Sequence, residues 1–366
     1  MNANPLRFEF ATATRIVFGA GKVQEIGMLA KTFGRRALVV IGKSAGAVQR
    51  VEPVLSALMQ AGVDYDTYSV SGEPTLDTVR AGRKACDLVI AFGGGSVIDT
   101  GKAIAALLTN PGDPLEYVEV IGQGRAIVNQ PVPFIAIPTT AGTGSEVTRN
   151  AVLGSPEHKV KVSLRSPLML PRVAVIDPDV IIAPPAQRLD ALTQLIEPFV
   201  SCKANPMTDA ICREGMRRWR EGGIENWALA ATFSGMALAN AGLGAVHGFA
   251  GPLGGMYDAP HGALCAALLP AVMEVNERAV AALVKRGGPE GRDYQSRLQR
   301  FSEVRQIIGD IPALVRELQI PPLRAYGIRR EDFPGIIPKA KAASSMKGNP
   351  VVLTDADLTE ILDKSW

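Results

Sequence analysis

Residues 88–97 read LVIAFGGGSV and decide the fold. The first five form a continuous apolar run, which is typical of a strand buried on both faces of a sheet. Three glycines and a serine follow at once, and residues 97–108 have a helical pattern. Glycine lets a ligand approach the backbone closely, and a helix N-terminus offers free N–H groups and a partial positive charge to a phosphate. The stretch predicts a strand, a phosphate-binding turn and a helix, although a tight turn without a ligand also uses glycine.

Strand-like and helix-like segments alternate on both sides of this stretch. Helical patterns lie at 51–62 and 75–86. The further runs that predict strands are 37–41, 64–70, 134–137 and 173–176. Alternating strands and helices indicate a mostly parallel sheet with helices on both faces. We therefore expect an α/β domain over residues 1–175.

The second half of the chain has a different pattern, because strand signals nearly vanish after Pro184-Pro185. The helices expected there are 187–202, 208–219, 227–243, 262–276, 297–308, 312–318 and 358–364. A stretch rich in glycine and proline, 248–262, is expected to be a loop between two of these helices. The sequence predicts an all-α domain over residues 176–366, joined to the first domain near residues 165–185.

The composition is that of an ordinary globular chain. Of 366 residues, 47% are hydrophobic and 20% charged, and the net charge is +3, so two domains can each bury a core. No basic stripe points to nucleic acid, and no apolar window approaches the roughly 20 residues of a membrane span. Cys86, Cys202, Cys212 and Cys265 form no C-x-x-C pair and are expected to be free thiols in a reducing compartment. We expect a cytoplasmic protein with no membrane or nucleic-acid partner.

A second polar loop follows the apolar run 134–137. Residues 138–148 read PTTAGTGSEVT, with five hydroxyl side chains and two glycines. A polar surface loop has a similar composition, but this loop and the glycine loop both follow apolar strands. Both are therefore expected at the carboxyl edge of one sheet, where open α/β sheets bind ligands. Beside the glycine loop, Ser96 is a candidate donor to a phosphate, and Asp99 is a candidate acceptor that supports the loop through backbone N–H groups.

Three polar residues of the second half are candidate metal ligands. His247 is expected to end one helix and His261 to begin the next, on either side of the glycine-rich stretch. Asp190 lies in an apolar helical segment, where an unpaired carboxylate is costly to bury. A cation would satisfy it, as would a helix cap or an ion pair. Three ligands with an open position are typical of a catalytic metal site. The simpler interpretation is that these three residues are polar groups of the core that hydrogen-bond to other parts of the protein. The third histidine, His158, is expected at the surface.

Seven motifs, spread over nearly the whole chain, point to one family. They are 14–21 (TRIVFGAG), 93–102 (GGGSVIDTGK), 138–146 (PTTAGTGSE), 177–178 (DP), 190–193 (DALT), 260–262 (PHG) and 349–350 (NP). With them the chain resembles the iron-containing (group III) alcohol dehydrogenases, which are related to glycerol dehydrogenase, maleylacetate reductase and, more distantly, dehydroquinate synthase. The resemblance implies a Rossmann-like domain followed by a helical domain, the architecture of dehydroquinate synthase, with a dinucleotide in the cleft between them.

The resemblance also implies which residues bind the dinucleotide. It places the phosphates on Gly93–Ser96, and the nicotinamide and ribose beside Thr139, Thr140 and Thr143. The complete set of candidate cofactor-binding residues is Gly42, Gly93, Gly94, Gly95, Ser96, Asp99, Thr139, Thr140, Thr143, Ser145, Val147 and Lys161. Strict NAD users often carry an acidic residue near position 42 that binds the ribose 2′-hydroxyl. Gly42 lacks that charge, and Lys43 and Ser44 are candidate contacts to a 2′-phosphate, so NAD and NADP both stay open.

The same resemblance assigns a divalent metal, iron or zinc, to Asp190, His247 and His261, which are also the expected catalytic residues. Two positions depart from the family. Many metal-dependent members carry histidine four residues after the aspartate, where this chain has Gln194, a weaker ligand through its carbonyl oxygen. Many also carry histidine at position 251, where Gly251 provides no group for proton relay. A site without bound metal is therefore an open alternative.

These features predict reversible hydride transfer between a small alcohol, aldehyde or ketone and NAD(P). A divalent metal would polarise the substrate oxygen, and the protein is expected to be a homodimer or higher homo-oligomer. Three alternatives stay open at this point: a metal-independent reductase of an oxo acid like maleylacetate reductase, a lyase like dehydroquinate synthase, and a non-catalytic NAD(P)-binding homologue.

Overall fold

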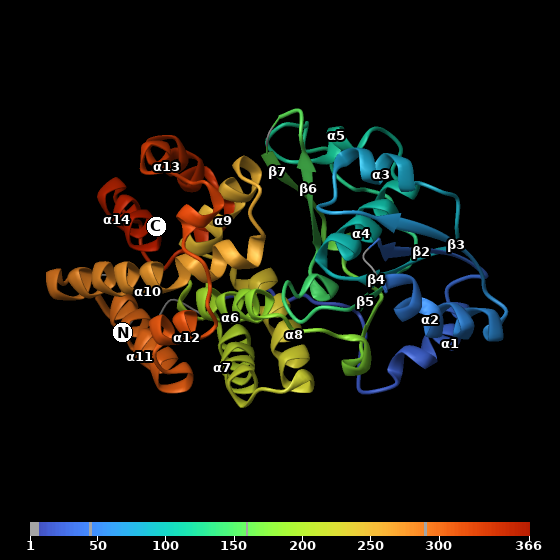
Figure 1. Ribbon diagram of the computed structural model, residues 1–366, viewed down its shortest axis with the longest axis horizontal. Helices are drawn as coiled ribbons and strands as arrows, with labels where there is room; N and C mark the ends of the chain where they lie inside the picture. The colour runs from blue at the N-terminus through green and yellow to red at the C-terminus, as the bar shows by residue number, and fades with distance from the viewer. Residues whose placement is uncertain (1–6, 44–45, 159, 289–290) are drawn as a thin grey trace.

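The computed structural model describes residues 7–43, 46–158, 160–288 and 291–366. A half that contains a sheet and a helical half lie side by side (Figure 1). The strands are β1 Ile16–Phe18, β2 Arg36–Gly42, β3 Asp64–Val70, β4 Leu88–Gly93, β5 Phe134–Pro138, β6 Asn150–Ser155, β7 Val160–Arg165 and β8 Val173–Ile176. The helices of this first half are α1 Ile26–Lys31, α2 Ala47–Ala61, α3 Leu76–Gly82, α4 Gly95–Thr109 and α5 Pro114–Tyr117.

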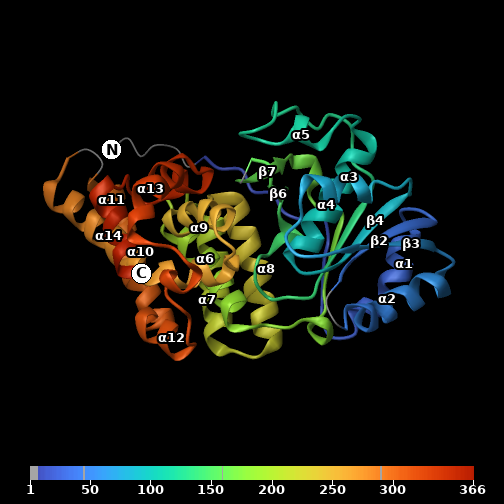
Figure 2. The same ribbon diagram turned by 45° about the horizontal axis from the view of Figure 1, so that its top comes forward.

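Six parallel strands of the described chain form the main sheet, in the order β1-β8-β5-β4-β2-β3. Alternate residues of its central strands face opposite sides. Val39 and Ile90 belong to the apolar core under α1 and α2, whereas Val40 and Ala91 belong to the core under α3 and α4. Figure 2 shows these helix pairs on opposite sides of the sheet. Burial on both faces explains why the central strands read as continuous apolar runs.

A small antiparallel hairpin, β6 with β7, was not predicted from the sequence. Its inward residues, Ala151 and Leu153 on β6 and Val162 and Leu164 on β7, join the core beside α4. Their outward neighbours are more exposed, so the hairpin alternates as a half-buried strand pair should. The hairpin contacts α4 through β6 and α9 through β7, and so connects the two halves of the molecule.

The helices of the second half are α6 Pro185–Val200, α7 Pro206–Glu221, α8 Ile224–Ala241, α9 Ala245–Met256, α10 His261–Arg286, α11 Gly291–Ile308, α12 Ile311–Glu317, α13 Phe333–Ala342 and α14 Asp355–Ser365. The longest, α10, packs against α6, α9, α11 and α14. One helix that the sequence did not predict, α13, packs on α9. Within the described ranges, no single helix is long and apolar enough to cross a membrane, and only α8 and α9 taken together, bent by 99°, meet that length and composition.

The glycine-rich stretch 248–262 is not the loop that was expected. Its first part belongs to α9, so His247 lies in the first turn of a helix rather than at the end of one. A close neighbour accounts for glycine at one position of α9: a Cβ built at Gly248 would lie 2.8 Å from Cε of Met346. Close packing of this kind outweighs the weak helix propensity of glycine. His261 begins α10, as the sequence predicted.

Candidate metal centre and dinucleotide-binding edge

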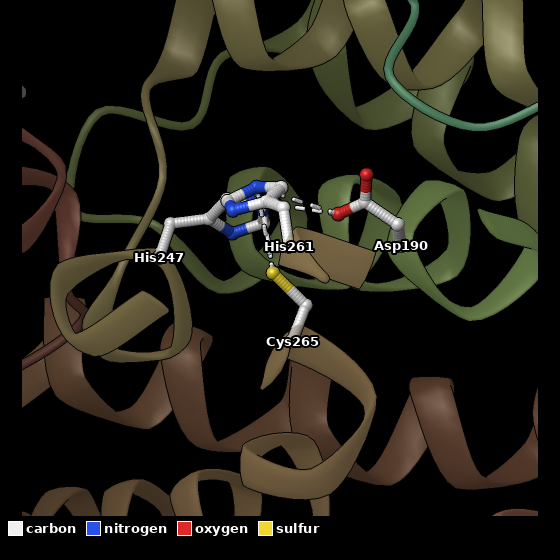
Figure 3. Close-up of side chains that lie close together, drawn as sticks. All are labelled: Asp190, His247, His261 and Cys265. Atoms are coloured by element: carbon white, nitrogen blue, oxygen red, sulfur yellow. Dashed lines mark hydrogen bonds and ion pairs between the residues drawn. The ribbon is translucent and has the colours of Figure 1, made fainter. Parts of the chain in front are cut away.

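Four side chains from three helices meet in the helical half (Figure 3). α6 supplies Asp190, α9 supplies His247, and α10 supplies His261 and Cys265. Oδ1 of Asp190 lies 3.4 Å from Nε2 of His247 and 3.9 Å from Nε2 of His261. One donor atom from each of the four residues lies within 4.8 Å of all the others. The fold thus brings together the three residues that the sequence singled out and adds Cys265 to them.

The carboxylate of Asp190 is incompletely satisfied. It is 2% exposed, and its Oδ1 makes no hydrogen bond to any described residue. Burial alone would raise the pKa of Asp190, but His247, His261 and Cys265 outweigh it and hold the pKa below its ordinary value. An ionised carboxylate without a full set of partners is costly in a protein core. A divalent cation shared with the two imidazoles meets this need, so the residues present fit a metal.

A carboxylate that the sequence did not single out, Glu197, orients His247. Nδ1 of His247 lies 2.7 Å from one oxygen of Glu197, and the other oxygen accepts the N–H of Val246 at 2.7 Å. In the neutral ring that a metal would bind, assigning the Nδ1 proton to this bond leaves the Nε2 lone pair on the side of Asp190, as in metal-binding histidines held by a carboxylate. Burial lowers the pKa of His247, but Cys265, Asp190 and Glu197 raise it well above its ordinary value. One sequence feature could have pointed to Glu197: it lies seven residues, or two helical turns, after Asp190 and so on the same face of α6.

The two positions that depart from the family pattern have different surroundings. Oε1 of Gln194 accepts a hydrogen bond of 3.0 Å from the hydroxyl of Ser234. Its carbonyl oxygen therefore has a partner outside the four-residue cluster, and its role as a metal ligand stays a prediction. A Cβ built at Gly251 meets no atom within 4 Å, so α9 leaves open space at this position.

The glycine loop and the threonine loop lie next to each other at the carboxyl edge of the sheet, as predicted. β4 and β5 are adjacent parallel strands. A Cβ built at Gly94 would lie 3.2 Å from Oγ1 of Thr140, and one at Gly95 would lie 2.9 Å from Oγ1 of Thr143. Among the described residues no side chain caps the N-terminus of α4, so its first N–H groups are available to an anion.

A buried lysine holds the threonine loop against α4. Nζ of Lys102 donates to the backbone oxygens of Ser145 and Asn150 and to the hydroxyls of Ser145 and Thr148, over 2.7 to 3.1 Å. Burial lowers the pKa of Lys102 to about 8, so the amine is still mainly charged at neutral pH. Asp99 accepts from the Ser145 hydroxyl and from a backbone N–H of β6. Its carboxylate therefore supports the neighbouring loop and strand rather than the glycine turn.

The remaining candidate cofactor residues lie around the same edge. Gly42 ends β2, and a Cβ built there would lie 3.7 Å from Cγ2 of Val97 at the start of α4. Nζ of Lys161 would lie 3.3 Å from a Cβ at Gly254, so Lys161 faces α9 in the helical half. Ser44, expected near a 2′-phosphate, lies outside the described residues. His158 is exposed, as expected.

The threonine loop also contacts α6, which carries Asp190, and its neighbour α8. A Cβ built at Gly142 would lie 3.0 Å from Cβ of Gln187, which is one turn before Asp190 on α6. Val147 is buried against Gly235 of α8, with its Cγ2 only 2.7 Å from a Cβ built at that glycine. The loop therefore lies between the sheet edge and the helix that carries Asp190.

Two family models match almost the whole chain. The model described as iron-containing alcohol dehydrogenase matches residues 13–178, and the model for the C-terminal part of the same family matches residues 186–366. The chain belongs to the iron-containing alcohol dehydrogenase family.

Individual relatives match over nearly their full length. The 1,3-propanediol dehydrogenase of Klebsiella pneumoniae is 33% identical, over 98% of this chain and 99% of its own. The lactaldehyde reductase of Escherichia coli K12 is 35% identical, over 95% and 97%. The crystal structure of a 1,3-propanediol oxidoreductase is 30% identical, with a TM-score of 0.86 over 99% of this chain and 100% of that one.

Family membership confirms several predictions made from the sequence. They are the resemblance itself, the α/β half followed by a helical half, and the enzyme class, which is that of an alcohol dehydrogenase. The cluster of Asp190, His247, His261 and Cys265 is consistent with a metal-dependent member. The oxo-acid reductase, lyase and non-catalytic alternatives are not favoured.

Proposed function

We propose that this alcohol dehydrogenase transfers a hydride between a small alcohol or aldehyde and NAD(P), with a divalent cation held by Asp190, His247 and His261. One observation carries the proposal: Oδ1 of Asp190 is buried without a hydrogen bond, and two imidazole Nε2 atoms lie 3.4 and 3.9 Å from it. Relatives named for propanediol and lactaldehyde support a small, oxygen-rich substrate.

The sheet edge would bind the dinucleotide. Backbone N–H groups of the glycine loop and the first turn of α4 would hold the phosphates, and the hydroxyls of Thr139, Thr140 and Thr143 would line the ribose and nicotinamide. NAD(P) supplies the ring carbon that accepts the hydride. We propose the same cofactor-binding set as the sequence indicated: Gly42, Gly93, Gly94, Gly95, Ser96, Asp99, Thr139, Thr140, Thr143, Ser145, Val147 and Lys161. Asp99, Ser145 and Val147 would act mainly by fixing the threonine loop.

The helical half would position the substrate oxygen. When bound, the cation supplies Lewis-acid polarisation of that oxygen. Glu197 holds the His247 ring so that Nε2 faces the cluster. The space beside Gly251 leaves room for substrate and for water. Since no side chain stands there, the alcohol proton would pass to water while the hydride goes to the nicotinamide.

We also propose the domain boundary, oligomeric state and cellular location that the sequence indicated. The dinucleotide-binding domain would end near residue 175 and the metal-binding domain would begin near residue 176. The protein would be a cytoplasmic homodimer or higher homo-oligomer. Limited proteolysis would test the boundary, light scattering the oligomeric state, and cell fractionation the location.

The function is tested by combining metal analysis of purified protein with a spectrophotometric screen of small alcohols, diols and aldehydes with NAD(H) and NADP(H). We expect one divalent cation per chain, turnover with at least one of these substrates, and loss of both metal and turnover in His261→Ala. Full turnover after complete metal removal would instead support the metal-independent reductase, and cofactor binding without any turnover would support the non-catalytic homologue.

A further inference from the structure

The metal cluster contains a cysteine for which the sequence motifs assign no role. Cys265 lies four residues after His261 on α10, so both side chains project from the same face of that helix, one turn apart. Cys265 is fully buried. Its Sγ lies 3.6 Å from Nε2 of His247 and 3.7 Å from Nε2 of His261. The thiol thus faces the two ring nitrogens that also face Asp190 (Figure 3).

The distances that join Asp190 and Cys265 to the two imidazoles are close to those expected around a single cation. Zinc bonds of about 2.0 to 2.3 Å in a tetrahedron place an oxygen and a nitrogen ligand about 3.3 Å apart, and a nitrogen and a sulfur ligand about 3.6 Å apart. The corresponding distances here are 3.4 and 3.9 Å from Asp190 to the two imidazoles, and 3.6 and 3.7 Å from Cys265 to the same nitrogens. Cys265 therefore lies where the fourth ligand of a tetrahedrally bound cation would lie.

Gln194, the other candidate for the fourth ligand, already has a hydrogen-bond partner outside the cluster. Gln194 is buried, and its side-chain oxygen accepts the hydroxyl hydrogen of Ser234 at 3.0 Å. To bind a cation, Gln194 would have to give up this bond and leave Ser234 with only its backbone acceptor on Ala231. Cys265 needs no such rearrangement.

We propose that the thiolate of Cys265 is the fourth protein ligand of the cation, so that the site is built from one carboxylate, two imidazoles and one thiolate. This proposal rests on the metal-dependent function proposed above. On binding, the S–H bond breaks, a metal–sulfur bond forms and the proton goes to solvent. Because thiolate is a soft ligand, this donor set favours Zn²⁺ over Fe²⁺. When bound, the cation would supply Lewis-acid polarisation of a substrate oxygen beside these four residues.

The first test uses the intact wild-type protein, stripped with a chelator and reloaded with Zn²⁺ or Co²⁺ alone. X-ray absorption of the zinc form should show a sulfur shell at about 2.3 Å, and the cobalt form should show a thiolate-to-cobalt charge-transfer band in the near ultraviolet. If the metal binds stoichiometrically with only nitrogen and oxygen ligands, Cys265 is not a ligand, although the proposed metal-dependent function stands. If no metal binds, both proposals fail.

The second test assigns the sulfur to Cys265. Cys265→Ser should lose the charge-transfer band and the sulfur shell and bind Zn²⁺ more than about 100-fold more weakly, a larger effect than changes outside the ligand set produce. Cys202→Ser is the matched control, because Cys202 is exposed and its Sγ lies 3.5 Å from a backbone oxygen of Lys347; it should keep both signals. Retention of the sulfur signals in Cys265→Ser would overturn the assignment. Should Cys265→Ser fail to fold, the wild-type spectra together with Cys202→Ser still decide whether sulfur binds.

Discussion

Each half of the molecule contains a buried charged cluster, one around Lys102 and one around Asp190, and the two clusters differ in how many partners they have. In the α/β half, the ammonium of Lys102 has four acceptor oxygens within 3.1 Å for its three N–H groups, and Asp99 lies 3.7 Å away. In the helical half, Asp190 is just as buried, yet its Oδ1 makes no hydrogen bond to the described residues. Both clusters connect segments that are far apart in sequence. The Lys102 ammonium is surrounded by protein oxygens, whereas Oδ1 of Asp190 lacks a hydrogen-bond donor among the described residues.

This difference separates a structural role from a ligand-binding role. A fully satisfied buried charge fixes the segments around it, and its loss is felt as instability. A carboxylate that lacks a partner, surrounded by two imidazoles and a thiol, is arranged for a group that comes from outside. Substitutions in the two clusters should therefore have opposite effects on stability and on function.

The largest effect is expected on catalysis, in Asp190→Asn. The amide keeps the shape of the side chain but removes the charge that would hold the cation, so kcat/KM should fall on the order of 10³-fold. The free energy of unfolding of the metal-free protein should change little, because the cost of burying an incompletely satisfied carboxylate offsets the loss of its attraction to the two imidazoles. Steady-state kinetics and denaturant unfolding measure the two quantities. Near wild-type turnover in Asp190→Asn would contradict the ligand-binding role given to the Asp190 cluster.

Lys102→Met should show the reverse pattern. It leaves the oxygens of Ser145 and Asn150 without their donor, and we expect a loss of about 3 kcal/mol in the free energy of unfolding. The affinity of the helical half for metal should stay unchanged. Lys84→Met, at an exposed position, is the matched control and should change stability by less than about 0.5 kcal/mol. Equal stability of the two variants would mean that Lys102 does not hold the threonine loop.

Glu197→Gln refines the comparison within the helical half. The amide can still accept one hydrogen bond, but it holds the His247 ring less firmly and makes the imidazole a weaker base. Metal affinity should fall about 10- to 100-fold, a smaller effect than loss of a ligand. Competition with a chromophoric chelator measures it. An unchanged affinity would contradict the orienting role given to Glu197.

Gly95→Ala extends the comparison to the sheet edge, with the smallest expected effect. The new Cβ would lie 2.9 Å from Oγ1 of Thr143 and should weaken dinucleotide binding about tenfold, which is about 1.4 kcal/mol. Gly335→Ala on α13 is the control, since nothing lies within 4 Å of a Cβ built there. Fluorescence titration with NADH and NADPH measures both variants. Equal affinities in wild type and Gly95→Ala would place the phosphates elsewhere.

Features that local sequence determines were predicted well. Residues 64–70 and 88–92 were expected to be strands, and the observed strands β3 and β4 cover the same residues with at most one more. The adjacency of the two loops was also predictable, because strands of a parallel sheet end at a common edge. Short or unusual elements were missed: β1 has three residues, and α9 contains four glycines and a proline whose cost is offset by packing that the sequence does not reveal.

The site was predicted only in part, for a related reason. Asp190, His247 and His261 were found because their residue types and motifs stand out. Glu197 and Cys265 were not, because their role depends on how α6, α9 and α10 cross, and this geometry has no local signal. Glu197 lies seven residues after Asp190, and Cys265 lies four residues after His261. These spacings are informative only once Asp190 and His261 are taken as ligands.

The most direct test of the difference between the two clusters is the thermal unfolding of chelator-stripped wild type, Asp190→Asn and Lys102→Met while Zn²⁺ or Fe²⁺ is titrated. A ligand that binds only the native state stabilises it by about 2.7 kcal/mol at 100 times its Kd. The Tm of wild type and of Lys102→Met, although the latter starts lower, should therefore rise with metal concentration, while the Tm of Asp190→Asn stays constant. No rise in wild type, or an equal rise in all three proteins, would contradict the assignment of Asp190 to a cation site.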